Sequence, residues 1–353
     1  MDRRSISAGG LTRRRFLSSS SAAAGTLVVT ATPALSSQDV GTSDRVPAGP
    51  RRRDVTFLSS GAALRGWFYE PETQPPWPLV VMAHGYSATR QMTADKYAEV
   101  FAAAGAAALL FDHRGFGGSD GQRRQINTWI QARGYFDALA FARRDPNVDE
   151  TRVAVWGDSL SGGVALVVAA IDASVAALIV QVPALGATMP PVGADGALFR
   201  GLKETVLTGA VEPTSPDEID GPMPVVSDDP IRRPAALDPL TAYRWFIEYG
   251  GRFGSGWLND VTRARPKVPV PWHPGLCAPH VSCPSLFVVS PRDEMPGAVT
   301  AVSRDAFDKI RAEKEWAEVD GGHFGLVYFP SAEFEAASSV QARFVSKRLL
   351  MLR

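Results

Sequence analysis

Hydrophobic residues in this chain gather into short continuous runs, and longer stretches with helical periodicity lie between them. Four of these runs contain almost only apolar side chains: residues 79–83, 106–111, 153–156 and 177–182. Such runs are typical of strands that are buried on both faces of a parallel sheet. The alternation of strands and helices predicts an α/β fold with a doubly wound, mostly parallel sheet and helices on both faces.

The alternation stops after residue 182 and returns near residue 283. Strands are then predicted at 285–290 and 315–319, with helices at about 298–312 and 332–350. The intervening segment, 183–282, is rich in Pro and Gly and contains a cluster of aromatic residues: Tyr243, Trp245, Phe246, Tyr249, Phe253 and Trp257. We interpret this segment as a lid inserted between two parts of one core, 54–182 and 283–353. The aromatic residues could equally pack as a satellite core.

One buried strand ends in a Gly/Ser-rich turn that leads directly into a small, apolar helix. In this turn, Gly157 and Ser161 flank Ser159 at two residues on either side. Small residues are needed there because such a turn holds its central residue at strained φ and ψ angles. The turn also places the central hydroxyl at a helix N-terminus, which favours developing negative charge. Ser159 is therefore the predicted nucleophile, and Ser161 is its rival.

A serine hydroxyl needs a base within hydrogen-bonding reach, and the base needs an orienting carboxylate. His323 follows the last predicted strand in a Gly-Gly-His loop, and Asp293 follows the strand before it. Because ligands of such sheets bind at the carboxyl ends of the strands, we expect both side chains to lie near the nucleophile. Glu294 and Asp320 compete with Asp293 for the role of the acid.

Acyl transfer also requires hydrogen-bond donors for the developing oxyanion. The backbone N–H of Leu160, directly after the nucleophile, is one candidate, and that of Tyr86, after the first buried strand, is the other. His84 and His113 lie in turns, where a structural role is expected. Asp158 is expected to face the pocket or the neighbouring loop, where it would shape substrate preference.

Five segments together resemble the alpha/beta-hydrolase superfamily: LVVMAHGYS, LLFDHRGFGGSDG, RVAVWGDSLSGGVAL, SLFVVSPRDEMP and VDGGHFGLVY. The likeness covers about residues 54–182 and 283–352, and it is nearest to the dienelactone-hydrolase-like and serine esterase-peptidase-like branches. It implies a triad in the order Ser159, Asp293, His323. The chain departs from the pattern of these proteins at two positions. Dienelactone hydrolases use a cysteine where this chain has Ser159, and Ser161 stands where the turn around the nucleophile usually has its second Gly.

Composition narrows the range of functions further. The chain has 353 residues and a formal net charge of zero, so nothing favours nucleic acid or an anionic membrane surface as a partner. No cofactor is expected, since the Gly-rich segments lack the arrangement of a dinucleotide site. A metal site is not expected either. Cys277 and Cys283 lie six residues apart, and a disulfide and two free thiols remain equally open.

The N-terminus has the features of a targeting signal. Arg13 and Arg14 precede Arg15-Phe16-Leu17 in a segment that resembles the twin-arginine export motif, and a mild apolar stretch follows at 22–35. We expect residues 1–36 to be a twin-arginine signal peptide and 37–53 to be a linker. This predicts export by the twin-arginine machinery to a periplasmic or extracellular location, without a stable membrane anchor. A disordered basic tail is the alternative.

These observations lead to one principal functional hypothesis and two others. The principal hypothesis is an exported serine hydrolase that cleaves small-molecule carboxylic esters through an acyl-enzyme on Ser159. The first alternative keeps the triad but cleaves an amide, a peptide or a C–C bond of a dicarbonyl or polyketide-like substrate. The second is a non-catalytic binding protein on the same fold. The sequence does not indicate the natural substrate or the oligomeric state.

Overall fold

The computed structural model describes residues 50–191 and 196–351. The strands of its main sheet are β1 (Arg51–Ser59), β2 (Ala62–Glu70), β3 (Trp77–Ala83), β4 (Ala107–Phe111), β6 (Val148–Asp158), β7 (Ala177–Gln181), β10 (Ser285–Val289) and β11 (Lys314–Glu318). The helices are α1 (Ala94–Ala103), α2 (Thr128–Ala142), α3 (Ser159–Ile171), α4 (Ala197–Thr208), α5 (Leu240–Gly250), α6 (Thr300–Lys309), α7 (Gly322–Gly325) and α8 (Ala332–Val345). Three short helical turns are η1 (Pro216–Glu218), η2 (Pro274–His280) and η3 (Ser346–Leu350).

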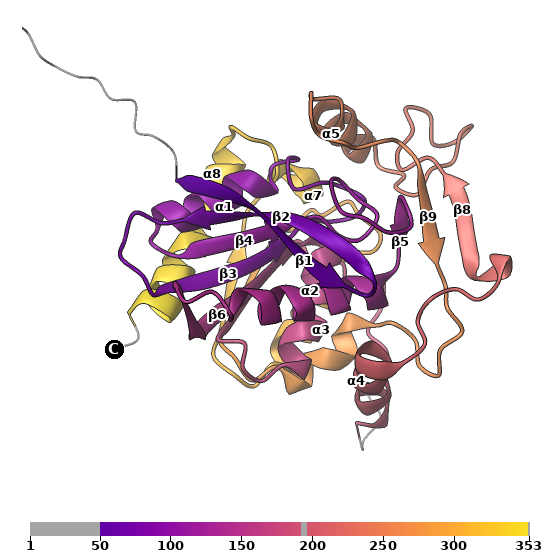
Figure 1. Ribbon diagram of the computed structural model, residues 1–353. Helices are drawn as coiled ribbons and strands as arrows, with labels where there is room; N and C mark the ends of the chain where they lie inside the picture. The colour runs from indigo at the N-terminus through magenta and orange to yellow at the C-terminus, as the bar shows by residue number, and fades with distance from the viewer. Residues whose placement is uncertain (1–49, 192–195, 352–353) are drawn as a thin grey trace, which may run out of the picture. The chain divides into compact units, whose positions relative to one another are not determined.

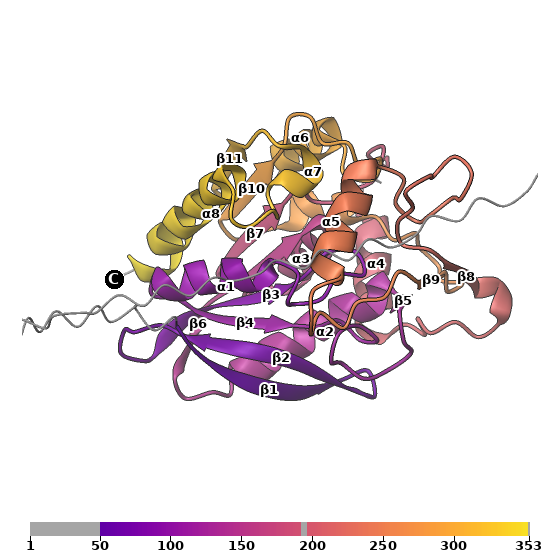
Figure 2. The same ribbon diagram turned by 90° about the horizontal axis from the view of Figure 1, so that it is seen from above.

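The main sheet has the strand order β1-β2-β4-β3-β6-β7-β10-β11 (Figures 1 and 2). From β4 to β11 all neighbouring strands are parallel, whereas β1 and β2 pair antiparallel at one edge. This topology confirms the predicted α/β fold with its mostly parallel sheet. The carboxyl ends of the parallel strands therefore meet along one edge, where α/β proteins bind their ligands.

Helices cover both faces of the sheet because alternate strand residues point to opposite sides. In β3, Leu79 and Val81 join the apolar cluster under α2, α3 and α6, whereas Val80 and Met82 join the cluster under α1 and α8 (Figure 2). All four side chains are fully buried. Burial of each such side chain stabilises the fold by about 1.5–3 kcal/mol, which explains why these strands have no polar face.

The first residue of the core differs from its predicted place. β1 begins at Arg51, inside the stretch expected to be a linker, because Arg51 to Arg53 continue the antiparallel ladder with β2. α1 begins at Ala94, well after the end of β3. The Arg90 N–H donates to Asp112 Oδ1 at 2.8 Å, and Thr93 has a φ of 78°, so the chain cannot yet be helical there.

A second sheet was not expected from the sequence. Its three strands are β5 (Gln125–Ile126), β9 (Val261–Ala264) and β8 (Ile219–Met223). β8 is short and mostly exposed, and Asp220 on it forms ion pairs with Arg263 and Arg265. Such a strand has no apolar periodicity, so pattern analysis could not detect it.

The predicted signal peptide and residues 37–49 of the predicted linker lie outside the described residues. Among the helices of the described ranges, none combines the length and the hydropathy needed to cross a membrane.

Candidate active site

Ser159 stands at the junction of β6 and α3, with a φ of 51°. This left-handed backbone is strained for a non-glycine residue. Close packing around it explains two glycines. A Cβ on Gly157 would lie 2.1 Å from the Ser161 carbonyl oxygen, and a Cβ on Gly85 would lie 2.9 Å from Ser159 Cβ. The start of α3 and the loop after β3 therefore both pack closely around Ser159.

The three side chains expected to form a triad lie in one hydrogen-bonded line. His323 Nε2 is 2.9 Å from Ser159 Oγ, and His323 Nδ1 is 2.8 Å from Asp293 Oδ2. Asp293 comes from the loop after β10, and His323 from α7 after β11. The side chains of Asp293 and His323 are only 2% and 4% exposed. With Nδ1 donating to Asp293, Nε2 is an acceptor for the Ser159 hydroxyl.

The other candidate acids have different partners. Glu294 Oε2 accepts the backbone N–H of His323 at 2.7 Å, and its other oxygen accepts the Thr241 hydroxyl, so it fixes the loop and not the imidazole. Asp320 pairs with Arg292 at the surface. Asp293 Oδ1 also accepts the Met295 N–H at 2.9 Å, which holds the carboxylate in place for the ring.

The turn between β6 and α3 that carries Ser159 is called the elbow below. The rival nucleophile Ser161 is fully buried beneath it. Its hydroxyl donates to the His84 carbonyl and lies 2.7 Å from His113 Nε2. Both histidine rings are themselves buried, and burial lowers the pKa of each. Ser161 therefore ties the loop after β3 to the start of α3, and it has no open path to a substrate.

The two expected oxyanion donors are backbone groups near Ser159. Leu160 is the second residue of α3, and N–H groups in the first turn of a helix have no acceptor within the helix. Tyr86 follows Gly85 in the loop that packs against Ser159, and it lines the same cavities as the serine. Both residues therefore lie close to Ser159 in the structure.

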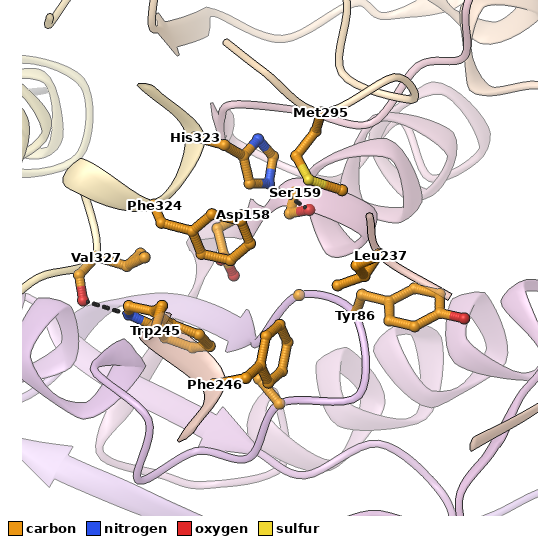
Figure 3. Close-up of a pocket in the computed structure, with 12 residues that line it drawn as sticks. Tyr86, Asp158, Ser159, Leu237, Trp245, Phe246, Met295, His323, Phe324 and Val327 are labelled. Atoms are coloured by element: carbon orange, nitrogen blue, oxygen red, sulfur yellow. Dashed lines mark hydrogen bonds between the residues drawn. The ribbon is translucent and has the colours of Figure 1, made fainter. Parts of the chain in front are cut away.

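Two cavities adjoin Ser159, and they share Tyr86, Leu237, Met295 and His323 in their walls. The smaller cavity, of about 30 Å³, lies between the elbow and α5 (Figure 3). Its remaining wall residues are Gly85, Ala88, Asp158, Trp245, Phe246, Phe324 and Val327. The larger cavity, of about 330 Å³, extends toward residues 295–298 and 236–238. Sequence analysis missed Leu237, Met295 and Phe324, although the last two lie one or two residues from predicted triad residues.

Asp158 lines the smaller cavity directly beside the serine. Its Oδ1 atom is buried and has no hydrogen-bond partner within the described ranges. Burial raises the pKa of this carboxyl to about 6, and the nearby His323 partly opposes that rise. The expectation that Asp158 faces the pocket agrees with this position.

The segment 183–282, expected to be a lid, has several roles in the structure. Trp245 and Phe246 of α5 line the smaller cavity, whereas Trp257 packs against Phe246 in a tilted arrangement with ring centroids 5.4 Å apart. Phe253 is fully exposed. By contrast, α4 and η2 pack into the core beside α2 and α3. From this segment, the described residues that line the two cavities are therefore Ala184, Ala236, Leu237, Asp238 and the α5 residues Trp245 and Phe246.

Cys277 and Cys283 are both free and buried, so the structure holds no disulfide between them. Burial raises the pKa of the Cys283 thiol to about 12 and that of Cys277 further, which makes both thiols poor nucleophiles. Within the described residues, no group of three or more His, Cys, Asp or Glu side chains is arranged to hold a metal ion.

Comparison with known proteins places this geometry in a family. Residues 74–249 match the family model described as serine aminopeptidase, S33. The quorum-quenching protein AidA of Acinetobacter baumannii is 29% identical over 310 residues, which cover 86% of this chain and 97% of AidA. The thiohydrolase aneE of Aspergillus aculeatus is 30% identical over 309 residues, or 83% of this chain and 92% of aneE.

The structure of this chain is also similar to a solved structure of an α/β hydrolase. The crystal structure of the α/β hydrolase GrgF from Penicillium sp. superposes with a TM-score of 0.64 at 25% identity, over 85% of this chain and all of GrgF. The chain therefore belongs to the alpha/beta-hydrolase superfamily.

Proposed function

We propose that this protein is a serine hydrolase that cleaves carboxylic esters through an acyl-enzyme on Ser159. The observation that supports this most directly is the line of hydrogen bonds from Ser159 through His323 to Asp293, with distances of 2.9 and 2.8 Å. All the parts of a nucleophile–base–acid unit are within reach of one another before any substrate binds.

In the proposed reaction, His323 Nε2 takes the proton of the Ser159 hydroxyl while Oγ attacks the ester carbonyl carbon. The oxyanion of the tetrahedral intermediate accepts the Leu160 and Tyr86 N–H groups. The imidazolium then protonates the leaving alcohol as the C–O bond breaks, which leaves an acyl group on Ser159. Water, deprotonated by His323, hydrolyses this ester and restores the serine. Asp293 keeps the ring in the required tautomer and stabilises the imidazolium.

The two cavities support substrates with one small and one larger group beside the carbonyl. The larger cavity is of the size that binds ordinary small ligands, whereas the smaller one, at about 30 Å³, is much more confined. Both have mainly apolar walls, and this favours medium-sized apolar esters over sugars or long peptides.

Thioester hydrolysis is a second candidate because two relatives that cover 83% of this chain, aneE and a protein of Eupenicillium brefeldianum, are named thiohydrolases. The same triad would form the same acyl-enzyme, with a thiol in place of an alcohol as the leaving group. Matched oxyester, thioester and amide substrates with one acyl group would separate these classes.

A fluorophosphonate probe tests the proposal. We expect it to label the wild type at Ser159 and to leave Ser159→Ala unlabelled, with loss of hydrolysis of p-nitrophenyl esters. Ser161→Ala is the matched control, and it should still be labelled at Ser159. Labelling that persists in Ser159→Ala and disappears in Ser161→Ala would place the nucleophile two residues further along.

We also propose that the protein is exported by the twin-arginine route, on the basis of Arg13 and Arg14 in the N-terminal motif. Replacing both with Lys should leave the precursor in the cytoplasm, as measured by fractionation and immunoblotting. The same change at Arg3 and Arg4, which precede a polar stretch, is the control and should not affect export. Unchanged export of the Arg13/Arg14 variant would contradict the proposal.

A further inference from the structure

The carboxylate of Asp158 is unusual among the acidic groups around the site. Asp293 is held by His323 and the Met295 N–H, and Glu294 by the His323 N–H and the Thr241 hydroxyl. In contrast, Asp158 Oδ1 is buried without a hydrogen-bond partner in the described part of the chain. A buried carboxylate oxygen without a donor is costly, so such a group in a native protein calls for an explanation.

The Gly85 N–H helps to stabilise the ionised carboxylate of Asp158, but the side chains of the cavity wall do not supply a donor for Oδ1. Figure 3 shows the Asp158 side chain extending from the elbow toward the side of the cavity that holds Phe324 and Trp245. The indole N–H of Trp245 already donates to the Val327 carbonyl at 2.9 Å. The imidazole of His323 is engaged on both nitrogens, and among the residues that the structure describes no Lys or Arg side chain lines this cavity.

The combination of one carboxylate and several aromatic rings has a defined chemistry. An ionised carboxylate only accepts hydrogen bonds, and it pairs most strongly with a cationic donor. Aromatic rings attract cations through their quadrupole, more strongly where water is excluded. A primary ammonium group offers three N–H donors to such a carboxylate, whereas a trimethylammonium group offers none.

We propose that the smaller cavity is a binding site for a primary ammonium group of the substrate, with Asp158 as its ion-pair partner and Phe324 and Trp245 as its aromatic walls. This inference rests on the proposed function and names its substrate class. The substrate is an ester or thioester whose smaller side carries an amine, while its larger apolar side occupies the larger cavity. Asp158 is then a specificity-determining residue beside the nucleophile.

Two matched sets of substrates test the proposal at pH 7. One set varies the alcohol, with benzoates of 2-aminoethanol, ethylene glycol and 1-propanol. The other varies the acyl group, with benzyl esters of glycine, glycolic acid and propanoic acid. We expect one of the two sets to place its variable group in the smaller cavity. In that set, the wild-type kcat/KM for the amine should exceed that for its alkyl counterpart by about tenfold or more. In Asp158→Asn this ratio should fall to near one.

Controls separate this site from general charge and from misfolding. Asp54→Asn removes the same charge from the exposed face of β1, and it should leave the ratio unchanged. With wild-type enzyme alone, ethylammonium chloride should inhibit hydrolysis of benzyl propanoate competitively, and 1-propanol at equal concentration should not. That measurement does not depend on the folding of any variant.

Several outcomes would overturn the inference. These are no amine preference in either set, a preference that survives in Asp158→Asn, or a stronger preference for the hydroxyl than for the amine. Ethylammonium without effect would also count against it. Failure of the proposed function looks different, because then no ester of either set is cleaved and the fluorophosphonate does not label Ser159.

Discussion

At the scale of single residues, the proposed triad divides one task among three chemically different groups. Ser159 supplies the attacking oxygen, and His323 carries the proton in both directions. Asp293 touches neither the substrate nor the moving proton, and it acts by orienting and stabilising the ring. Groups that act as one unit lose their combined effect when any essential member is removed.

We therefore expect Ser159→Ala and His323→Ala each to lower kcat by at least about 10⁴-fold, and the double variant to lower it little further. Asp293→Asn should cost a similar factor or less, because the ring can then adopt the wrong tautomer. Steady-state kinetics with one p-nitrophenyl ester measures all four enzymes. Glu294→Gln should have a smaller effect than Asp293→Asn, and full activity in His323→Ala would overturn the mechanism.

Gly85 offers a second test at this scale. A Cβ at this position would lie 2.9 Å from Ser159 Cβ and 3.2 Å from Asp158 Oδ2, so the loop that carries the Tyr86 N–H would have to move. Misplacement of catalytic groups by about 1 Å can cost about 10²-fold in rate. Gly85→Ala should therefore reduce kcat by about 10²-fold. Gly118→Ala, where the nearest atom is a flexible Arg90 side-chain nitrogen at 3.4 Å, should retain activity.

The residue scale also shows what sequence patterns can and cannot predict about a site. Ser159, Asp293 and His323 each follow a buried strand, and parallel topology brings such ends together, so the pattern predicted their proximity. The unpartnered Oδ1 of Asp158 could not be predicted in this way. It depends on which side chains of distant segments surround the carboxylate, and a linear pattern carries no information about that.

At the scale of elements, α5 is a helix of the inserted segment that lines the smaller cavity. Its residues Trp245 and Phe246 line the smaller cavity, and their rings lie 4.9 Å apart in an edge-to-face arrangement. Trp245 is buried against Phe324, which follows the proposed base. The helix thus contributes both to the walls of the site and to the support of the loop that carries His323.

This double role predicts a change in selectivity on substitution. Trp245→Ala enlarges the cavity, so the dependence of kcat/KM on acyl chain length should shift toward longer chains. A series of p-nitrophenyl esters from acetate to octanoate measures this. Trp257→Ala removes a ring of the same size that packs against Phe246, and it serves as a comparison for loss of packing. If both variants change only the melting temperature, the aromatic cluster is core and not a pocket wall.

Elements differed in how readily the pattern of residues predicted them. β3, β4, β6, β7 and β10 are buried along their whole or central length, so continuous apolar runs identified them. β8 and β9 are stabilised by pairing with each other and by ion pairs such as Asp220–Arg263. Tertiary contacts specify these strands, and their local sequence contains no period-2 signal.

At the scale of the whole molecule, the fold gathers the site from segments that are far apart in the chain. The walls of the two cavities come from the loops after β3, β6, β10 and β11 and from α5 and the residues before it. A site assembled in this way includes a cost in stability, since its groups are arranged for a ligand and not for one another. Asp158 is where this cost should be measurable.

The pKa of Asp158 is raised from 3.8 to about 6 in the folded protein, so folding favours its protonated form. Between about pH 4 and 6 the folded state holds more protons at this group than the unfolded state, and stability therefore falls as pH rises through this window. The penalty is absent near pH 4 and complete above pH 6. A shift of this size corresponds to at most about 3 kcal/mol, and partial solvation of the carboxylate reduces it.

Asp158→Asn should therefore increase the free energy of unfolding by about 1–2 kcal/mol at pH 8 and have little effect at pH 4. Urea denaturation of the wild type and the variant at both pH values measures the difference, with Asp54→Asn as an exposed control of the same charge change. Equal or lower stability of Asp158→Asn at pH 8 would mean that the carboxylate has a stabilising partner within the folded chain. An increase in the free energy of unfolding that appears only above pH 6 would show that the ionised Asp158 carboxylate destabilises the folded protein. Such a cost is expected for a carboxylate whose role is to bind a ligand.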